Sequence, residues 1–232
     1  MLSVIMPTMW KFHYTARFLE QIVNYDAIGE IIVIDNESSS RPESAVFTNP
    51  KIRLIDFGKN IFVNPAWNHG ASTARYDNLC FLSDDVIVDL RSFYEADRYL
   101  TANKDNSIGL LCGLCEHELH NQPKISTGEI EIYSTNEKPG IGFHGGFSYF
   151  FCRKESYIPI PDKLKIVCGD AYLWNKMREL DKTHHMMYNY FYYSPWNVTV
   201  NFITKTDELA QILREDLENW DRMIENKEVM YS

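Results

Sequence analysis

The feature that most constrains the fold is an alternation of short apolar runs with stretches of helical periodicity. The runs are apolar at every position, which indicates strands buried on both faces. Such strands, separated by helices, form a mostly parallel sheet with helices packed on both sides. We therefore expect an α/β fold. The expected strands cover 2–6, 31–34, 52–57, 79–82 and 108–114, and the expected helices cover 14–25, 65–75 and 90–100.

The second half of the chain is less regular. Its patterns predict a strand over 147–152, a helix over 169–180, an extended aromatic segment over 187–196 and a charged helix over 207–228. No repeat, low-complexity tract or linker divides the chain, so we expect one domain over 1–232. In the first half, Asn64 is the expected N-cap of a helix with Pro65 at its first position.

Composition excludes several classes of protein. The formal net charge is −9, and no basic run offers the positive face that a non-specific nucleic-acid binder needs. Five widely spaced cysteines do not form a disulfide framework, which favours reduced thiols and a cytoplasmic location. Cys112 and Cys115 form a CxxC without the second pair that a zinc site requires. No window has the roughly 20 apolar residues of a membrane span, so we expect a soluble protein.

Polar residues follow two of the expected strands at their carboxyl ends. These are Asp35 with Asn36, and Asp84 with Asp85. Ligands of open α/β sheets bind in the crevice at those ends. Adjacent carboxylates repel, which favours a compensating Mg²⁺ or Mn²⁺ that shares its oxygen ligands with a phosphate. An asparagine can both donate to and accept from a base or ribose. Ordinary polar turns, which favour the same residue types, are the alternative.

Three further polar residues are candidates for chemistry. Asp170 follows a glycine at the start of an expected helix, where it would serve either as a general base or as an N-cap. His185, in a pair of histidines, is a candidate metal ligand, and His144 is a candidate contact to an acceptor. Structural roles for both histidines stay open.

Taken in order, these segments resemble the family 2 glycosyltransferases of the GT-A type. The resemblance implies an α/β fold with a single GT-A-type (Rossmann-like) domain, whose mostly parallel central sheet is flanked by helices. It further implies a nucleotide-sugar-binding half over 1–115 and an acceptor-binding half over 116–232 with a C-terminal helix. The segments that carry it are 3–8, 30–38, the set Asn60, Ala66, Asn68 and Gly70, then 81–85 and 169–174.

The resemblance implies a nucleotide pocket built by residues of the first half. Thr8, Asp35 and Asn36 would line the pocket for the base and ribose. Asn60 and Asn68 would support that pocket. Asn36 stands where some family members have a second aspartate.

The resemblance also implies how the reaction would proceed. Asp84 would contact the ribose or the donor sugar, and Asp85 would ligate Mn²⁺ or Mg²⁺, with His185 as a further candidate ligand. Asp170 would be the base of an inverting displacement. Phe62 stands where the family often has glycine, and would narrow the pocket.

The predicted function is therefore a metal-dependent inverting glycosyltransferase. It would move a sugar from a nucleotide-diphospho-sugar, with a UDP-sugar favoured, to a hydroxyl of a carbohydrate or glycoprotein acceptor. The turn after the first strand lacks glycine, which argues against a dinucleotide-binding enzyme. A nucleotidyltransferase and a catalytically inactive sugar-nucleotide-binding protein remain the alternatives. The expected aromatic contacts to the acceptor are Tyr149, Trp174, Tyr190, Tyr192 and Trp196.

Overall fold

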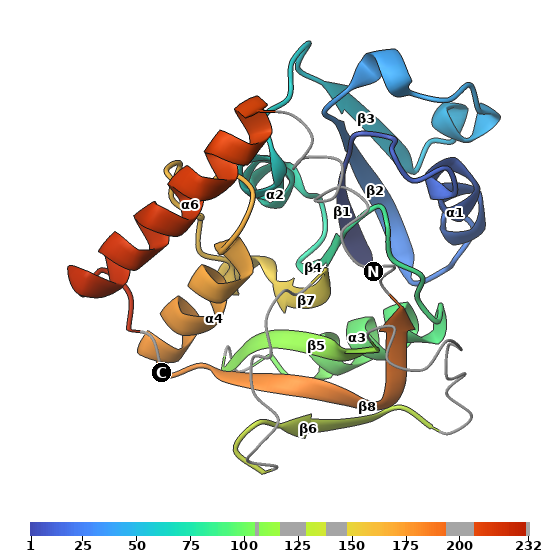
Figure 1. Cartoon of the computed structure of the whole chain (residues 1–232). Coiled ribbons are helices and arrows are strands. Elements are labelled where there is room, and N and C mark those ends of the chain that lie inside the picture. Colours follow the sequence, from blue (N-terminus) through green and yellow to red (C-terminus); the bar gives the residue numbers. More distant parts are fainter. Residues whose placement is uncertain (105–106, 117–128, 138–147, 194–206, 231–232) are drawn as a thin grey trace.

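The computed structural model describes residues 1–104, 107–116, 129–137, 148–193 and 207–230. These residues form an eight-stranded sheet with the order β3-β2-β1-β4-β7-β5-β8-β6 (Figure 1). The strands are β1 (Leu2–Thr8), β2 (Ile28–Asp35), β3 (Ile52–Asp56), β4 (Asn78–Leu82), β5 (Ile108–Glu116), β6 (Glu131–Ser134), β7 (Tyr149–Arg153) and β8 (Thr183–Tyr193).

The sheet is mostly parallel, as expected. Strands β1 to β4 pair in parallel, and β5 pairs in parallel with β8. Strand β7 lies antiparallel between β4 and β5, so that these two neighbours of β7 point in the same direction. Strand β6, which the sequence patterns did not predict, pairs antiparallel with β8 at one edge. The carboxyl ends of six strands therefore lie along one edge of the sheet.

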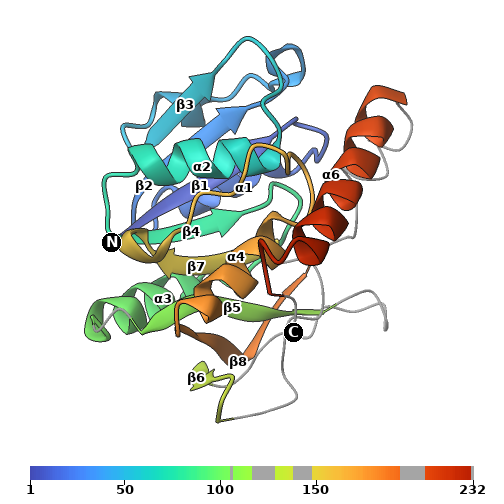
Figure 2. The same cartoon turned by 90° about the vertical axis from the view of Figure 1, so that its left-hand side faces the viewer.

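Helices cover both faces of the sheet (Figures 1 and 2). Residues of α1 (Thr15–Ile22) and α3 (Arg91–Ala102) belong to one apolar core. Residues of α2 (Val63–Thr73), α4 (Gly169–Glu179) and α6 (Asp207–Glu225) belong to the other. Short 3₁₀ turns cover Ser38–Ser40, Ala45–Thr48 and Lys154–Ser156.

Both faces of the central strands are apolar because each strand feeds two cores. In β1, Val4 and Met6 point into the core beneath α1 and α3, whereas Ile5 points into the core beneath α2. All three side chains are fully buried. This explains the continuous apolar runs in the sequence, since successive side chains of a strand point to opposite faces.

The start of α2 differs from the prediction. The helix begins at Val63, and its N-cap position is held by Phe62, whose φ of 67° and ψ of 179° lie in a region that favours glycine. The expected N-cap, Asn64, lies instead in the first turn and is buried. Its side-chain amide donates to backbone carbonyls 100 and 103 residues further along the chain, so it is not available to cap the helix.

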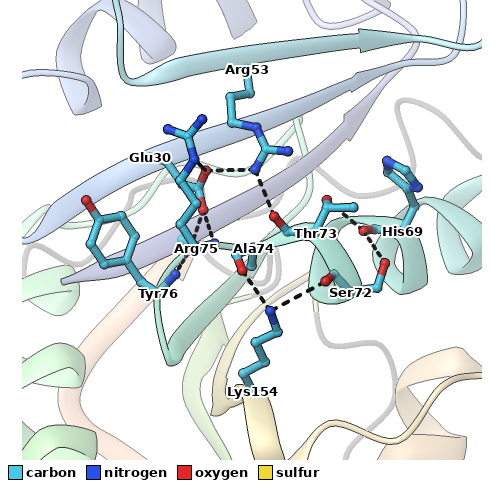
Figure 3. A network of polar contacts seen from close by, with 10 residues as sticks. Glu30, Arg53, His69, Ser72, Thr73, Ala74, Arg75, Tyr76 and Lys154 are labelled. Carbon is cyan, nitrogen blue, oxygen red and sulfur yellow. Dashed lines mark hydrogen bonds and ion pairs between the residues drawn. The ribbon is translucent and has the colours of Figure 1, made fainter.

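The end of α2 is fixed to the sheet by charged side chains (Figure 3). Arg53 on β3 donates to the buried carboxylate of Glu30 on β2 and to the carbonyl of Thr73, each at 2.9 Å. Lys154 donates to the carbonyl of Ala74 at 2.7 Å. Cations at a helix C-terminus satisfy its last carbonyls and its dipole. Burial raises the pKa of Glu30, but the bonds it accepts, that from Arg53 foremost, outweigh burial and lower it.

Candidate functional site

The polar residues expected at the strand ends do meet. Thr8 ends β1 and is the register partner of Asp35, the last residue of β2. The hydroxyl of Thr8 forms a short hydrogen bond with the carboxylate of Asp84, which follows β4. The amide of Asn36 donates to the Thr8 carbonyl at 2.8 Å, and its side-chain oxygen accepts from the amide of Ile61 at 3.0 Å. Three parallel strands thus converge on one polar site.

The carboxylate of Asp35 is held in a fixed orientation. Its Oδ1 accepts from the indole Nε1 of Trp10 at 2.8 Å and from the amide of Glu37 at 3.1 Å. Its Oδ2 accepts from the guanidinium of Arg41 at 3.1 Å. Sequence reasoning missed both Trp10 and Arg41. Trp10 was detectable as a donor-only side chain just past a strand end, whereas no local pattern points to Arg41.

Two adjacent carboxylates, those of Asp84 and Asp85, are buried at the end of β4, with exposed fractions of 6% and 8%. Burial foremost, and the neighbouring charge of Asp85, raise the pKa of Asp84 to about 7 against the opposing hydrogen bond from Thr8. Burial also raises the pKa of Asp85. The main causes of the two shifts are burial, hydrogen bonds and, for Asp84, the charge of Asp85.

The pair fits a hard divalent cation in its chemistry. Carboxylate oxygens are the ligands of Mg²⁺ and Mn²⁺, and one or two carboxylates suffice when a phosphate completes the coordination. Within the described part of the chain, no group of three or more His, Cys, Asp or Glu side chains could hold a metal ion alone.

His185 lies away from this pair, contrary to its predicted role as a metal ligand. It is the third residue of β8, and its Nδ1 is 2.8 Å from the hydroxyl oxygen of Tyr99. His185 pairs with Leu111 of β5. Leu111 and Cys80 of β4 both pair with Phe151 of β7, which lies between them, so the three strands β8, β5 and β4 are aligned at this level. Three strand spacings, about 14 Å, therefore separate His185 from β4. His185 cannot share a metal with Asp85 in this arrangement.

Two of the aromatic residues expected to face an acceptor are part of the core instead. Tyr149 is fully buried, and its hydroxyl lies 2.6 Å from that of Ser92. The ring of Trp174 is buried and stacked on His184, with centroids 3.8 Å apart. Neither ring is open to a sugar, and burial of large aromatic surface accounts for both. The remaining predictions fall outside the described side chains: Tyr190, Tyr192, Trp196 and His144.

The side chains of Asn60 and Asn68 form hydrogen bonds with backbone groups. The Oδ1 of Asn60 accepts from the amide of Phe62 at 2.8 Å, which helps to set the turn before α2. The side chain of Asn68 donates to the carbonyl of Ile160 at 2.8 Å and accepts from its amide at 2.9 Å. Both contacts are compatible with the supporting role that the family resemblance implies.

Asp170 is the second residue of α4, and Cys168 occupies the N-cap position, so Asp170 is not the N-cap. Its Oδ1 accepts from the amide of Ala171 at 2.9 Å. Burial first, and then the charge of Asp170, raises the pKa of Cys112 on β5. Cys112 lies level with Phe81, one residue before β4 ends. Gly169, the residue before Asp170, lies against Asn64 in the first turn of α2. Asp170 therefore lies near the carboxyl edge of the sheet, on the face covered by α2, α4 and α6.

The sheet, its helices and the acidic carboxyl edge define the fold class as that of the GT-A glycosyltransferases. Solved structures agree: S. aureus TarS 1-349 aligns with a TM-score of 0.62 and 16% identity, over 97% of this chain and 72% of that one. TarS 1-349 in complex with UDP-GlcNAc aligns at 0.61 with 15% identity and the same coverages. GalNAc-T7 with UDP, GalNAc and Mn²⁺ aligns at 0.56 with 13% identity, over 83% and 42%. Identities this low establish the fold alone.

Sequence comparison establishes the family. The profile described as Glycosyl transferase family 2 matches residues 3–157, and the chain belongs to this family. A comparison with curated protein sequences gave no match. None of the helices in the described ranges has the length and apolar character needed to cross a membrane.

Proposed function

We propose that this glycosyltransferase moves a sugar from a UDP-sugar to an acceptor hydroxyl with inversion at the anomeric carbon, and that it depends on a divalent cation. The observation that carries the proposal is the buried carboxylate pair, Asp84 and Asp85, beside the ends of β1 and β2. Structural neighbours bound to UDP-GlcNAc, UDP or UDP with Mn²⁺ support the choice of donor and cation.

The donor would bind along the carboxyl edge of β1, β2 and β4. Thr8, Asp35 and Asn36 would surround the base and ribose, and the fixed orientation of the Asp35 carboxylate would favour one placement of the base. Asp84 would accept from a hydroxyl of the ribose or sugar. Asp85 would hold the cation together with the diphosphate, and a bound cation would neutralise the charge that develops on the leaving group.

Asp170 would act as the general base. Its carboxylate lies in the first turn of α4, and a carboxylate can take the proton of an attacking hydroxyl. The acceptor oxygen would form a bond to the anomeric carbon while the bond from that carbon to the diphosphate breaks. The acceptor proton would pass to Asp170. A single displacement inverts the anomeric centre, and residues 116–232 would bind the acceptor.

The experiment that tests this function is a panel of nucleotide sugars with Mn²⁺, scored by the product released. Free UDP is expected, and free pyrophosphate would indicate a nucleotidyltransferase. Asp170→Asn should lower kcat by about 10²- to 10⁴-fold, the range of general-base catalysis. Asp26→Asn, which changes an exposed carboxylate, is the matched control.

Thermal shift measurements distinguish the proposed enzyme from the other alternative, a catalytically inactive protein that binds a sugar nucleotide. It requires donor-dependent stabilisation of the wild type and of Asp170→Asn alike, with no turnover by either protein. Stabilisation that disappears with EDTA and in Asp85→Asn would support the cation site. Full turnover by Asp85→Asn would contradict it.

A further inference from the structure

The segment 164–167, which leads directly into α4, is held by a buried carboxylate of α6. Asp216 is 1% exposed and accepts three backbone N–H groups. Its Oδ1 accepts from Lys165 at 2.9 Å, and its Oδ2 accepts from Ile166 at 2.5 Å and from Val167 at 3.0 Å. Three successive amides directed at one carboxylate fix the backbone of this segment more firmly than packing alone.

The same segment is held from the opposite side by α2. The side-chain amide of Asn64 donates to the carbonyls of Leu164 and Val167, both at 3.2 Å. The backbone amide of Asn64 donates to the carbonyl of Lys165 at 3.0 Å. Asn64 therefore binds the carbonyls of the segment while α6 binds its amides. Together these contacts satisfy most of the backbone polar groups of the segment without secondary structure.

This clamp sets the position of the candidate base. Cys168, with a φ of 62°, makes the turn from the segment into α4. Gly169 follows and lies so close to Asn64 that a Cβ would be 2.1 Å from its Oδ1. Asp170 is the next residue, so its position depends on a chain path fixed on both sides. The path allows no side chain at Gly169 without displacing Asn64.

We infer that Asp216, with Asn64, is a positioning residue for Asp170, an inference that rests on the proposed role of Asp170 as the base. Asp216 lies in α6, outside the residues 3–157 that match the family profile. It acts on Asp170 through the segment 164–167. A base displaced by about 1 Å can lower the rate about 10²-fold, so fixing this path matters for turnover.

The test combines kinetics with hydrogen exchange in Asp216→Ala and Asp216→Asn. An asparagine can keep one oxygen on two of the three amides, so its effects should be intermediate. The alanine variant should lower kcat by about 10²-fold and leave KM for the donor within about twofold, because the donor site is built from other elements. Glu215→Gln, an exposed neighbour on α6, is the control.

Hydrogen exchange reads the position of Asp170 without relying on activity. The amide of Ala171, bonded to the Asp170 carboxylate, and the amides of 165–167 should exchange at least about tenfold faster in Asp216→Ala. Circular dichroism checks that each variant folds, and Asp216→Asn serves if the alanine variant does not.

Each outcome has one meaning. Unchanged exchange at Ala171 overturns the inference, whether or not the protein transfers a sugar. Faster exchange with unchanged kcat also overturns it, while the proposed function stands. If the wild type transfers no sugar, the proposed function fails. Exchange at Ala171 then still decides whether Asp216 positions Asp170.

Discussion

Replacing the buried Asp84 with asparagine should change how stability depends on pH. The folded pKa of Asp84 is about 7, and its ordinary value is 3.8. The folded protein therefore binds a proton that the unfolded chain has lost, and this stabilisation is present at low pH and disappears as the pH rises through about 7. From the two pKa values, the free energy of unfolding of the wild type should fall by about 3 kcal/mol between about pH 5 and about pH 8. Asp84→Asn lacks this loss.

The assay is urea unfolding of the metal-free wild type and variant in EDTA at both pH values. Other titrating groups are common to the two proteins, so the comparison reports the titration of Asp84 together with its coupling to Asp85. The free energy of unfolding of Asp84→Asn, measured against that of the wild type, should be about 3 kcal/mol higher at the higher pH than at the lower pH. For a chain of this size, that corresponds to a change of about 8 °C in the difference between the two Tm values. Asp26→Asn, at an exposed position, should show no such gain. Parallel pH profiles for wild type and Asp84→Asn would refute the reasoning.

Three further variants test the backbone and the charge network. Phe62→Gly should be more stable than Phe62→Ala by about 1–3 kcal/mol, because both lose the ring but only glycine removes the strain at a φ of 67°; thermal melts compare the two. Gly169→Ala should cost about 1–3 kcal/mol in urea unfolding, and less in an Asn64→Ala background, where the clashing atom is gone. Glu30→Gln should cost about 2 kcal/mol at neutral pH, since Arg53 loses its charged partner; the wild type should lose this advantage as the pH falls below 4.5, because the folded pKa of Glu30 is lowered.

The parts of the fold that sequence predicts are those set by local pattern. The strands that became β1 to β5 were placed because their apolar runs feed two cores, as Ile5 and Met6 show. The antiparallel direction of β7 was not predictable, since its run 147–152 has the same pattern as a parallel strand. Strand β6 was missed because its four residues, Glu131–Ser134, lie at the sheet edge and are half-buried or exposed.

The candidate site divides in the same way. Asp35 and Asp84 could be placed together from sequence, because parallel strands bring their carboxyl ends to one edge, and the family resemblance added Thr8. His185 and Tyr149 were misplaced, since a residue type alone does not say at which end of a strand, or on which face, a side chain lies. The contacts that fix the site join residues far apart in the chain and leave no periodic signal.

Strained backbone marks the places where the chain enters the site. Among the described residues, non-glycine residues with positive φ include Trp10, Phe62 and Cys168. Trp10 follows the end of β1, Phe62 precedes α2, and Cys168 precedes α4. Such conformations cost about 1–3 kcal/mol each and persist only where the surroundings determine them. Here those surroundings are the Asp35 carboxylate at Trp10, Asn60 at Phe62, and the segment held by Asp216 at Cys168. The polar contacts beside each turn therefore offset strain that an isolated loop would relax. They hold the end of β1 and the starts of α2 and α4 in fixed positions around the carboxylate pair.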